Sequence, residues 1–268
     1  MPVGITIIGA LGKMGREIAE IVYDDPECYL EGAVEYPDHP LHGKEYSTPN
    51  GISDKPVFVT DSLTGLSGSE SACIDFSSPA SLQHYLPQAA EKKRPVVIGT
   101  TGLAENDLEF IKSFSTAIPI IVSPNMSLGV NLLFLLTELV SERLKDSFDI
   151  EIIEAHHRFK KDSPSGTAKR IGEIAAAALG LPYDSCIENG RVGISPDARK
   201  PKSIGMHAVR GGDIVGDHTV LFAGIGERLE LRHVAHSRSN FARGSVLAAK
   251  WLSKQQPGFY TMRDVLQL

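Results

Sequence analysis

The chain has 268 residues, of which 42% are hydrophobic and 22% charged, and its formal net charge is −6. This length allows one large domain or two of ordinary size, and the composition is typical of globular proteins. The acidic balance argues against nucleic-acid binding, which requires a basic surface. The apolar runs are shorter than the roughly 18–20 residues of a membrane-spanning helix, and because Met1 leads straight into a strand-like run we expect no secretory signal. Because the three cysteines are scattered, we expect reduced thiols and a cytoplasmic protein.

The first chemical signal is a glycine turn between a strand and a helix. A β-branched apolar run leads into Gly9, Gly12 and Gly15, and an amphipathic helix pattern follows. In a dinucleotide-binding turn these glycines would make the tight turn, admit a pyrophosphate and pack the helix on the strand, although the spacing here is GxxGxxG rather than GxGxxG. The next strand-like run, 29–34, ends at Glu35, where an acidic residue would accept hydrogen bonds from the adenosine ribose. A dinucleotide site is predicted, and the alternative is a structural glycine turn in some other α/β domain.

Strand-like and helix-like runs alternate through the first half of the chain. The strand-like runs are 3–8, 29–34, 56–59, 72–76, 95–98 and 118–122, and the helical runs are 13–23, 80–91 and 104–114. This alternation predicts βαβ units and an α/β fold with a doubly wound, Rossmann-type parallel sheet. Small polar residues follow three of the strand-like runs, at Ser77, Gly99–Gly102 and Ser123–Met126. The carboxyl ends of parallel strands meet at one edge, so these turns favour a cofactor groove beside the glycine turn.

The second half of the chain has a different rhythm. The expected elements are a connecting helix from Asn131 to about Leu144, a strand at 148–156, a helix at 166–179, a long loop at 182–203, strands at 204–209, 214–223 and 227–235, and a helix at 240–252. This strand-rich block predicts a second, α+β domain with an open mixed sheet, whose uncovered face is a candidate subunit interface. We therefore expect a dinucleotide-binding domain of residues 1–126 and 240–268, and a substrate-binding and oligomerisation domain of residues 127–239.

The stretch EIIEAHHRFKKDSPSGTA concentrates proton-carrying and anion-binding groups. His156, His157 and Lys160 come at the end of the expected strand. Behind them, Ser165 or Thr167 can cap a helix whose first backbone N–H groups lack partners, and such a helix start attracts carboxylate or phosphate. The combination predicts an active site for an anionic small molecule, against the alternative of a solvated basic loop before an ordinary helix.

The most specific motif, E-x-H-H-x-x-K-x-D-x-P-S-G-T-A, runs from Glu154 to Ala168. With it, the chain resembles the 4-hydroxy-tetrahydrodipicolinate reductase family, long called dihydrodipicolinate reductase, of bacterial and plant diaminopimelate and lysine biosynthesis. The resemblance runs almost end to end and includes Gly9–Gly15, Gly99–Thr101, Asn125, Arg210–Gly216 and Met262–Leu266. It implies an oxidoreductase that reduces 4-hydroxy-tetrahydrodipicolinate, a cyclic dicarboxylate, to tetrahydrodipicolinate with NADH or NADPH. It also implies a homotetramer assembled through the second domain.

The resemblance assigns roles to individual residues. It makes His156 the proton donor and acceptor and Lys160 a proton donor. The positions that would hold the substrate carboxylates are His157, Gly166 and Thr167. The implied cofactor contacts are Gly9, Ala10, Leu11, Gly12, Lys13, Met14, Glu35, Gly99, Thr100, Thr101, Ser123, Pro124, Asn125 and Met126. The chemistry agrees, because hydride delivery to a conjugated ring builds negative charge that an ammonium stabilises, and imidazole, with an ordinary pKa of about 6.5, exchanges protons near neutral pH.

Two positions depart from the family's pattern and bear on the cofactor. Tyr36 stands where many members have an arginine that can meet an NADP 2′-phosphate, and Met126 stands where many have an aromatic residue near the expected nicotinamide. The charge of Glu35 would repel a 2′-phosphate, and residues 36–43 contain no lysine or arginine. We therefore expect NADH to be used at least as well as NADPH, unless a cation arrives from elsewhere in the fold.

Other functions fit the residues less well. Short-chain dehydrogenases need Tyr-x-x-x-Lys, which this sequence lacks. Semialdehyde dehydrogenases need an activated cysteine near a histidine, and none of the three cysteines has an evident helix-start or basic setting. A non-catalytic dinucleotide-sensing regulator would not need Lys160 and His156 beside an anion-binding helix start. His233 and His236 form another close pair, but without neighbouring cysteine or carboxylate ligands they predict no metal site.

Overall fold

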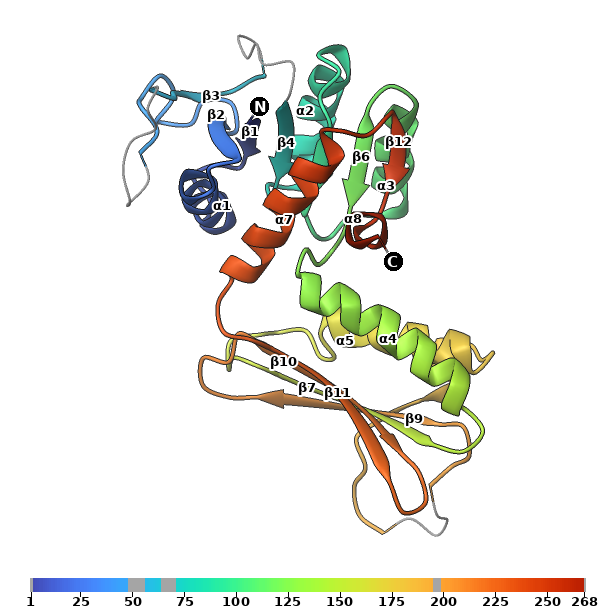
Figure 1. The fold of residues 1–268 in the computed structure, drawn as a ribbon. Helices are drawn as coiled ribbons and strands as arrows, with labels where there is room; N and C mark the ends of the chain where they lie inside the picture. Colours follow the sequence, from blue (N-terminus) through green and yellow to red (C-terminus); the bar gives the residue numbers. More distant parts are fainter. Residues whose placement is uncertain (1, 48–55, 64–70, 195–198, 268) are drawn as a thin grey trace. The chain divides into compact units, whose positions relative to one another are not determined.

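The computed structural model describes residues 2–47, 56–63, 71–194 and 199–267 (Figure 1). Contacts between residues divide the chain into two compact units. The first unit comprises Met1–Leu128 and Arg238–Leu268, and the second comprises Gly129–Ser237.

The first unit is built on a parallel sheet of seven strands. The strands are β1 (Val3–Ile8), β2 (Cys28–Val34), β3 (Val59–Thr60), β4 (Ser71–Asp75), β5 (Val96–Ile98), β6 (Pro119–Val122) and β12 (Gly258–Tyr260). Their order is β12-β6-β5-β4-β1-β2-β3, and every neighbouring pair is parallel. All six residues of β1 are buried, as expected for a central strand covered on both faces. The predicted α/β, doubly wound parallel sheet is confirmed.

Helices from opposite sides complete the first unit. They are α1 (Lys13–Asp24), α2 (Pro79–Glu91), α3 (Glu105–Ser113), α7 (Ser239–Leu252) and α8 (Met262–Leu266), with a 3-10 turn at Phe114–Thr116. The helices α1 and α7 contribute to one hydrophobic cluster, and α2 and α3 to another. The predicted strand at 56–59 was wrong in extent, because only Val59 and Thr60 form β3 and Phe58 makes a single bridge to Glu45. The strand β12 was not predicted, since three residues carry too little periodicity.

The second unit contains a mixed sheet of five strands. The strands are β7 (Asp149–His156), β8 (Ile187–Asn189), β9 (Ile204–Arg210), β10 (Gly216–Ala223) and β11 (Arg228–Ala235), in the order β11-β10-β7-β9-β8. β10 is antiparallel to β7 and β11, whereas β9 is parallel to β7 and β8. The predicted loop 182–203 was partly wrong: it contains β8 and a short helix, α6 (Tyr183–Cys186). Residues 195–198 of that loop lie outside the described residues.

Two helices cover one face of this second sheet (Figure 1). Side chains of α4 (Leu128–Leu144) and α5 (Gly166–Ala178) form one hydrophobic cluster with inward-facing residues of the strands. Burial along β10 alternates strictly, which is the pattern of a sheet packed on one face only. On the opposite face, which we call the open face, Ile153 is 39% exposed and Val209 48% exposed. The expected second domain with an open mixed sheet is therefore observed.

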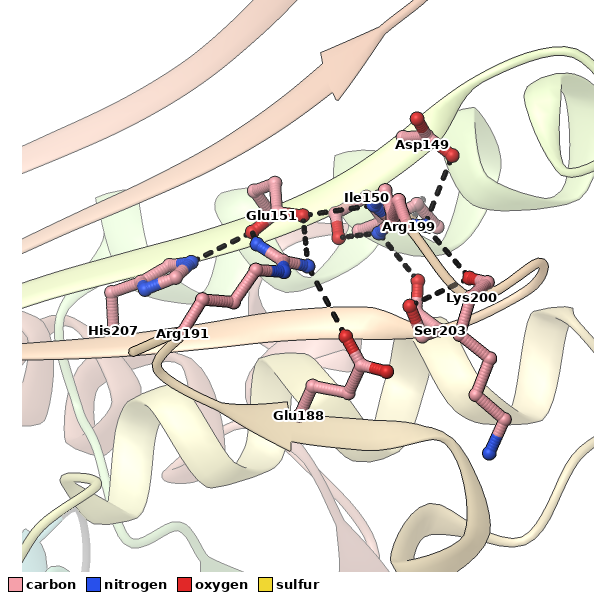
Figure 2. Close-up of polar contacts among 9 residues, drawn as sticks. All are labelled: Asp149, Ile150, Glu151, Glu188, Arg191, Arg199, Lys200, Ser203 and His207. Atoms are coloured by element: carbon pink, nitrogen blue, oxygen red, sulfur yellow. Dashed lines mark hydrogen bonds and ion pairs between the residues drawn. The ribbon is translucent and has the colours of Figure 1, made fainter. Parts of the chain in front are cut away.

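The open face carries a cluster of ion pairs around Glu151 (Figure 2). The guanidinium of Arg191 donates to both carboxylate oxygens of Glu151, at 2.9 and 2.8 Å. Arg199 Nε and His207 Nε2 lie 3.0 and 2.7 Å from the same carboxylate. Burial alone would raise the pKa of Glu151, but its hydrogen bonds to Arg191, His207 and Arg199 lower that pKa to about 2. These contacts hold Arg191 and Arg199, which lie on either side of residues 195–198, against the sheet.

Candidate active site

The glycine turn of the first unit leaves a helix start without a side-chain cap. Gly9 adopts a φ of +78°, and a Cβ at Gly15 would collide with the backbone oxygens of Gly9 and Ala10. Gly12 is the N-cap of α1 and supplies no capping side chain, so backbone N–H groups of the first turn have no side-chain acceptor from the cap. A helix start of this kind, reached through close-packed glycines, suits the pyrophosphate of a dinucleotide.

Glu35 lies against this turn. Its Oε1 accepts a hydrogen bond of 2.6 Å from the backbone N–H of Leu11, although 24 residues separate the two in sequence. Tyr85 Oη donates to the backbone oxygen of Glu35 at 2.6 Å and fixes the end of β2. Arg16 reaches the same turn from α1, where its Nε donates to the backbone oxygen of Leu11 at 3.1 Å. Sequence reasoning left open a cation from elsewhere in the fold, and Arg16 is a candidate for it.

The other predicted cofactor residues lie at the carboxyl ends of β5 and β6, on the same edge of the sheet as the turn after β1. Asp75 forms hydrogen bonds at this edge. Its Oδ1 accepts from the backbone N–H of Ser77 at 2.9 Å, and the same N–H also donates to Thr100 Oγ1 at 3.0 Å. Burial raises the pKa of Asp75 to about 6. The side chain of Met126 is 1% exposed, so a cofactor contact through it would require it to move.

Exposure varies among the predicted cofactor residues. The exposed ones are Gly12, Lys13, Thr101 and Pro124; those of intermediate exposure are Gly9, Leu11, Met14 and Asn125; and the buried ones are Ala10, Glu35, Gly99, Thr100, Ser123 and Met126.

In the second unit, the buried carboxylate of Glu154 binds His156. Both residues are on β7 and point to the face covered by helices, because alternate residues of a strand share a face. His156 Nδ1 lies 2.6 Å from Glu154 Oε2. Burial lowers the pKa of His156 below its ordinary value, and the hydrogen bond to Glu154 only partly opposes this. The lowered pKa favours the neutral imidazole.

Lys160 lies in the turn that follows β7. Its Nζ forms an ion pair of 3.0 Å with Asp162 Oδ1, and its backbone N–H donates to the backbone oxygen of His157 at 3.1 Å. The ring of His157 lies 6.4 Å from that of Phe159, which is 78% exposed. His157 Nδ1 is buried and finds no hydrogen-bond partner among the residues that the structure describes. A buried polar atom of this kind favours a polar ligand.

The helix start behind these residues is capped by Ser165. Its Oγ accepts from the backbone N–H of Ala168 at 3.1 Å, which resolves the choice left open between Ser165 and Thr167. Gly166 and Thr167 are the first two residues of α5, and the N-terminus of a helix carries partial positive charge. Gly166 is exposed, and a Cβ there would meet nothing within 4 Å. This end of α5 can receive an anionic group.

Sequence reasoning missed His218 and the role of Arg210, which donates to both carboxylate oxygens of Glu154 at 2.8 Å. His218 Nε2 lies 3.2 Å from Ser165 Oγ, and its ring packs edge-on against that of His156, with centroids 5.2 Å apart. Burial and the nearby His156 lower the pKa of His218 to about 3. The sheet register explains the cluster, since His218 of β10 stands opposite Glu154 and Arg210 of β9 opposite His156. Strand pairing of this kind is not visible in a single sequence.

Comparison with known proteins gives matches along the whole chain. Residues 3–126 match the family described as dihydrodipicolinate reductase, N-terminus, and residues 129–266 match dihydrodipicolinate reductase, C-terminus. The 4-hydroxy-tetrahydrodipicolinate reductases of Thiobacillus denitrificans and Aquifex aeolicus are each 46% identical to this chain, over 268 and 272 aligned residues that cover 100% of both chains. The structure of the dipicolinate-bound dihydrodipicolinate reductase from Paenisporosarcina sp. TG-14 has a TM-score of 0.76 at 24% identity, covering 97% of this chain and 98% of that one, and shows the shared fold.

The fold and these matches define an oxidoreductase that uses a nicotinamide dinucleotide. Within this class, the chain belongs to the dihydrodipicolinate reductase family. The predicted activity, reduction of 4-hydroxy-tetrahydrodipicolinate in diaminopimelate and lysine biosynthesis, is thereby confirmed. In the described part of the chain, no helix is long and apolar enough to cross a membrane. Across the same residues, no group of three or more His, Cys, Asp or Glu side chains is placed to hold a metal ion.

Proposed function

We propose that His156 and Lys160 carry the proton chemistry of this reductase. The observation that carries the proposal is the 2.6 Å contact of His156 Nδ1 with the buried carboxylate of Glu154, at the end of the strand that leads into the turn holding the ammonium of Lys160. The nicotinamide dinucleotide supplies the hydride when bound. Lys160 stabilises the negative charge that develops on the substrate ring and donates the balancing proton, while His156 accepts and returns a proton through Nε2.

The substrate carboxylates are held, in this proposal, by His157 and by the first residues of α5, Gly166 and Thr167. Three features support it: the Nδ1 of His157 without a partner among the described residues, the open space at Gly166, and the partial positive charge of a helix N-terminus. A dicarboxylate needs two such positions on opposite sides of the proton donor. His157 and the start of α5 are the two positions that we assign to the carboxylates.

Replacement of His156 tests the assignment. His156→Ala is expected to lower kcat by roughly 10²-fold or more and to remove the corresponding limb of the kcat–pH profile. Phe159→Ala is the matched control, because Phe159 lies in the same turn and carries no titratable group. An unchanged pH profile in His156→Ala would assign the proton chemistry elsewhere.

The predicted cofactor contacts remain part of the proposal, with NADH used at least as well as NADPH. Glu35 holds the glycine turn through Leu11 and is positioned to accept from ribose hydroxyls. Arg16 on the same turn partly offsets the repulsion between Glu35 and a 2′-phosphate, so both cofactors are expected to bind. Glu35→Ala should shift the ratio of kcat/KM values toward NADPH, and Arg16→Ala should shift it toward NADH, each by about two- to fivefold. A strong preference for NADPH that neither variant changes would contradict this part of the proposal.

We further infer a homotetramer that assembles through the open face of the second sheet. This face exposes Ile153, Val209 and Val234, and no helix among the described residues packs on it. Ile153→Asp should therefore yield smaller species in sedimentation velocity, whereas Leu247→Asp, at an exposed position of α7, should not. A wild-type protein that sediments as a monomer at micromolar concentration would contradict assembly. The cytoplasm remains the proposed location, consistent with three cysteines that are all buried and unpaired.

A further inference from the structure

We propose that Glu154 is a positioning residue that fixes the tautomer and orientation of His156, so that Nε2 is the nitrogen presented for proton exchange. The inference rests on the proposed role of His156 and deepens it. Three observations carry it: the donors around Glu154, the surroundings of the His156 ring, and a second glutamate on the same strand.

The carboxylate of Glu154 is surrounded by donors. Its side chain is fully buried, and Arg210 donates to both oxygens at 2.8 Å through its two terminal nitrogens. The backbone N–H of Ser165 donates to Oε1 at 3.0 Å, and His156 Nδ1 meets Oε2 at 2.6 Å. Because arginine and backbone N–H groups only donate, the carboxylate can only accept here. The Nδ1 atom of His156 must therefore carry the proton, which leaves Nε2 of the neutral ring with a lone pair.

Nε2 is left accessible by the residues around the ring. It makes no hydrogen bond to the residues that the structure describes. A Cβ at Gly216 would lie 3.1 Å from Nε2, so glycine at this position leaves it room. His218 packs edge-on against the ring and limits its tilt. The titratable groups facing the ring are Glu154 from β7, Arg210 from β9, His218 from β10 and Lys160 from the turn after β7.

Glu151 provides a matched comparison on the same strand. Glu151 binds two arginines and one histidine, where Glu154 binds one arginine, one backbone N–H and one histidine, and Glu151 lies on the open face of the sheet (Figure 2). Its histidine, His207, is bound through Nε2. A glutamate that serves only to pair charges should resemble Glu151 in its effects, whereas a positioning glutamate should alter His156.

The decisive experiment replaces each glutamate by glutamine. In Glu154→Gln, the amide oxygen should keep accepting from the backbone N–H of Ser165, because this backbone donor has a fixed direction. The amide NH₂ then faces His156 Nδ1, so Nδ1 must accept and the proton moves to Nε2. Selective ¹⁵N labelling of histidine reports this change directly, with the His156 signals assigned by their loss in His156→Ala. We expect the Nδ1–H form in the wild type and in Glu151→Gln, and the Nε2–H form in Glu154→Gln.

Kinetics supply the second readout. Glu154→Gln should lower kcat by about 10²-fold with the substrate KM within a few-fold, and should move the limb of the pH profile that belongs to His156 to lower pH, because the nearby negative charge is lost. Glu154→Asp keeps the charge on a shorter side chain, so its kcat should lie between those of the wild type and Glu154→Gln. This variant also provides a test if Glu154→Gln does not fold. Glu151→Gln should leave the pH profile unchanged.

The outcomes separate the two proposals. A wild-type tautomer and pH profile in both Glu154 variants would overturn the positioning role. Full turnover in His156→Ala would overturn the proposed function of His156, while the ¹⁵N signals would still report whether Glu154 sets its tautomer.

Discussion

Glu151 and Glu154 lie three residues apart on β7, and each binds arginine and histidine side chains, yet they have opposite surroundings. Glu151 is on the open face, and its partners bind a surface segment to the sheet (Figure 2). Glu154 is buried beneath the start of α5, and its histidine keeps one nitrogen without a partner among the described residues. The same ion-pair chemistry therefore supports structure on one face and a reaction site on the other. The difference comes from what surrounds the histidine: the open face of the sheet in one case, Lys160 and a helix start in the other.

The largest expected difference between the two faces is catalytic. Lys160→Ala should lower kcat by roughly 10²- to 10⁴-fold while the cofactor dissociation constant changes by less than about threefold, because the ammonium acts on charge that develops in the transition state. Steady-state kinetics and cofactor fluorescence titration measure the two quantities. Lys161→Ala, an exposed neighbour, and Arg191→Ala on the open face should keep kcat. A Lys160→Ala enzyme within a few-fold of wild type would show that another group donates the proton.

The second difference concerns stability in mild acid and belongs to the face with Glu154. The pKa of His218 is about 3 in the folded protein, against 6.5 for the ordinary side chain, so between these values the unfolded chain binds more protons. Stability contributed by the neutral ring is present above pH 6.5 and is lost as the pH falls toward 3, by at most about 5 kcal/mol. Urea unfolding at several pH values should show a shallower decline in His218→Gln than in wild type. The exposed His236→Gln variant should retain the wild-type decline, and equal slopes in all three proteins would contradict the prediction.

The local parts of both sites could be predicted from the sequence. The turn Gly9–Gly15 and the cap of α5 depend on residues close together in the chain, and both were expected where the structure has them. Contacts between distant strands could not be predicted in this way. His218 joins Glu154 only because β10 pairs with β7 in a particular register, and Arg210 joins it because β9 pairs on the other side.

The open face illustrates the same limit. Its existence was expected from the number of strands and helices, but the cluster around Glu151 was not. Arg191 and Arg199 lie 40 and 48 residues from Glu151 in sequence, inside a stretch expected to be a long loop. A charged residue in a loop carries no sign of its partner until the sheet order is known, because loop conformation depends on the surface it crosses.

The third difference lies at lower pH and belongs to the open face. Glu151 has a pKa of about 2 in the folded protein, against 4.5 for the ordinary side chain. Its ion pairs therefore contribute stability above pH 4.5 that is lost as the pH falls through 2, by at most roughly 3 kcal/mol. Glu151→Gln should be less stable than wild type at neutral pH, and the gap should close in strong acid. A gap that is independent of pH would mean that packing over Gly205, rather than charge, gives Glu151 its effect.

The smallest expected effect separates substrate binding from proton chemistry at the helix start. Thr167→Val keeps the shape of the side chain but removes the hydroxyl at the second residue of α5. If that hydroxyl donates to a substrate carboxylate, its loss should raise KM by roughly tenfold and leave kcat nearly unchanged, since a hydrogen bond to a charged group contributes equally to ground state and transition state. Thr167→Ser restores the hydroxyl and should restore KM, whereas Thr219→Val on the open face should change neither constant. A lower kcat at unchanged KM would instead place Thr167 with Lys160 and His156 in the chemical step.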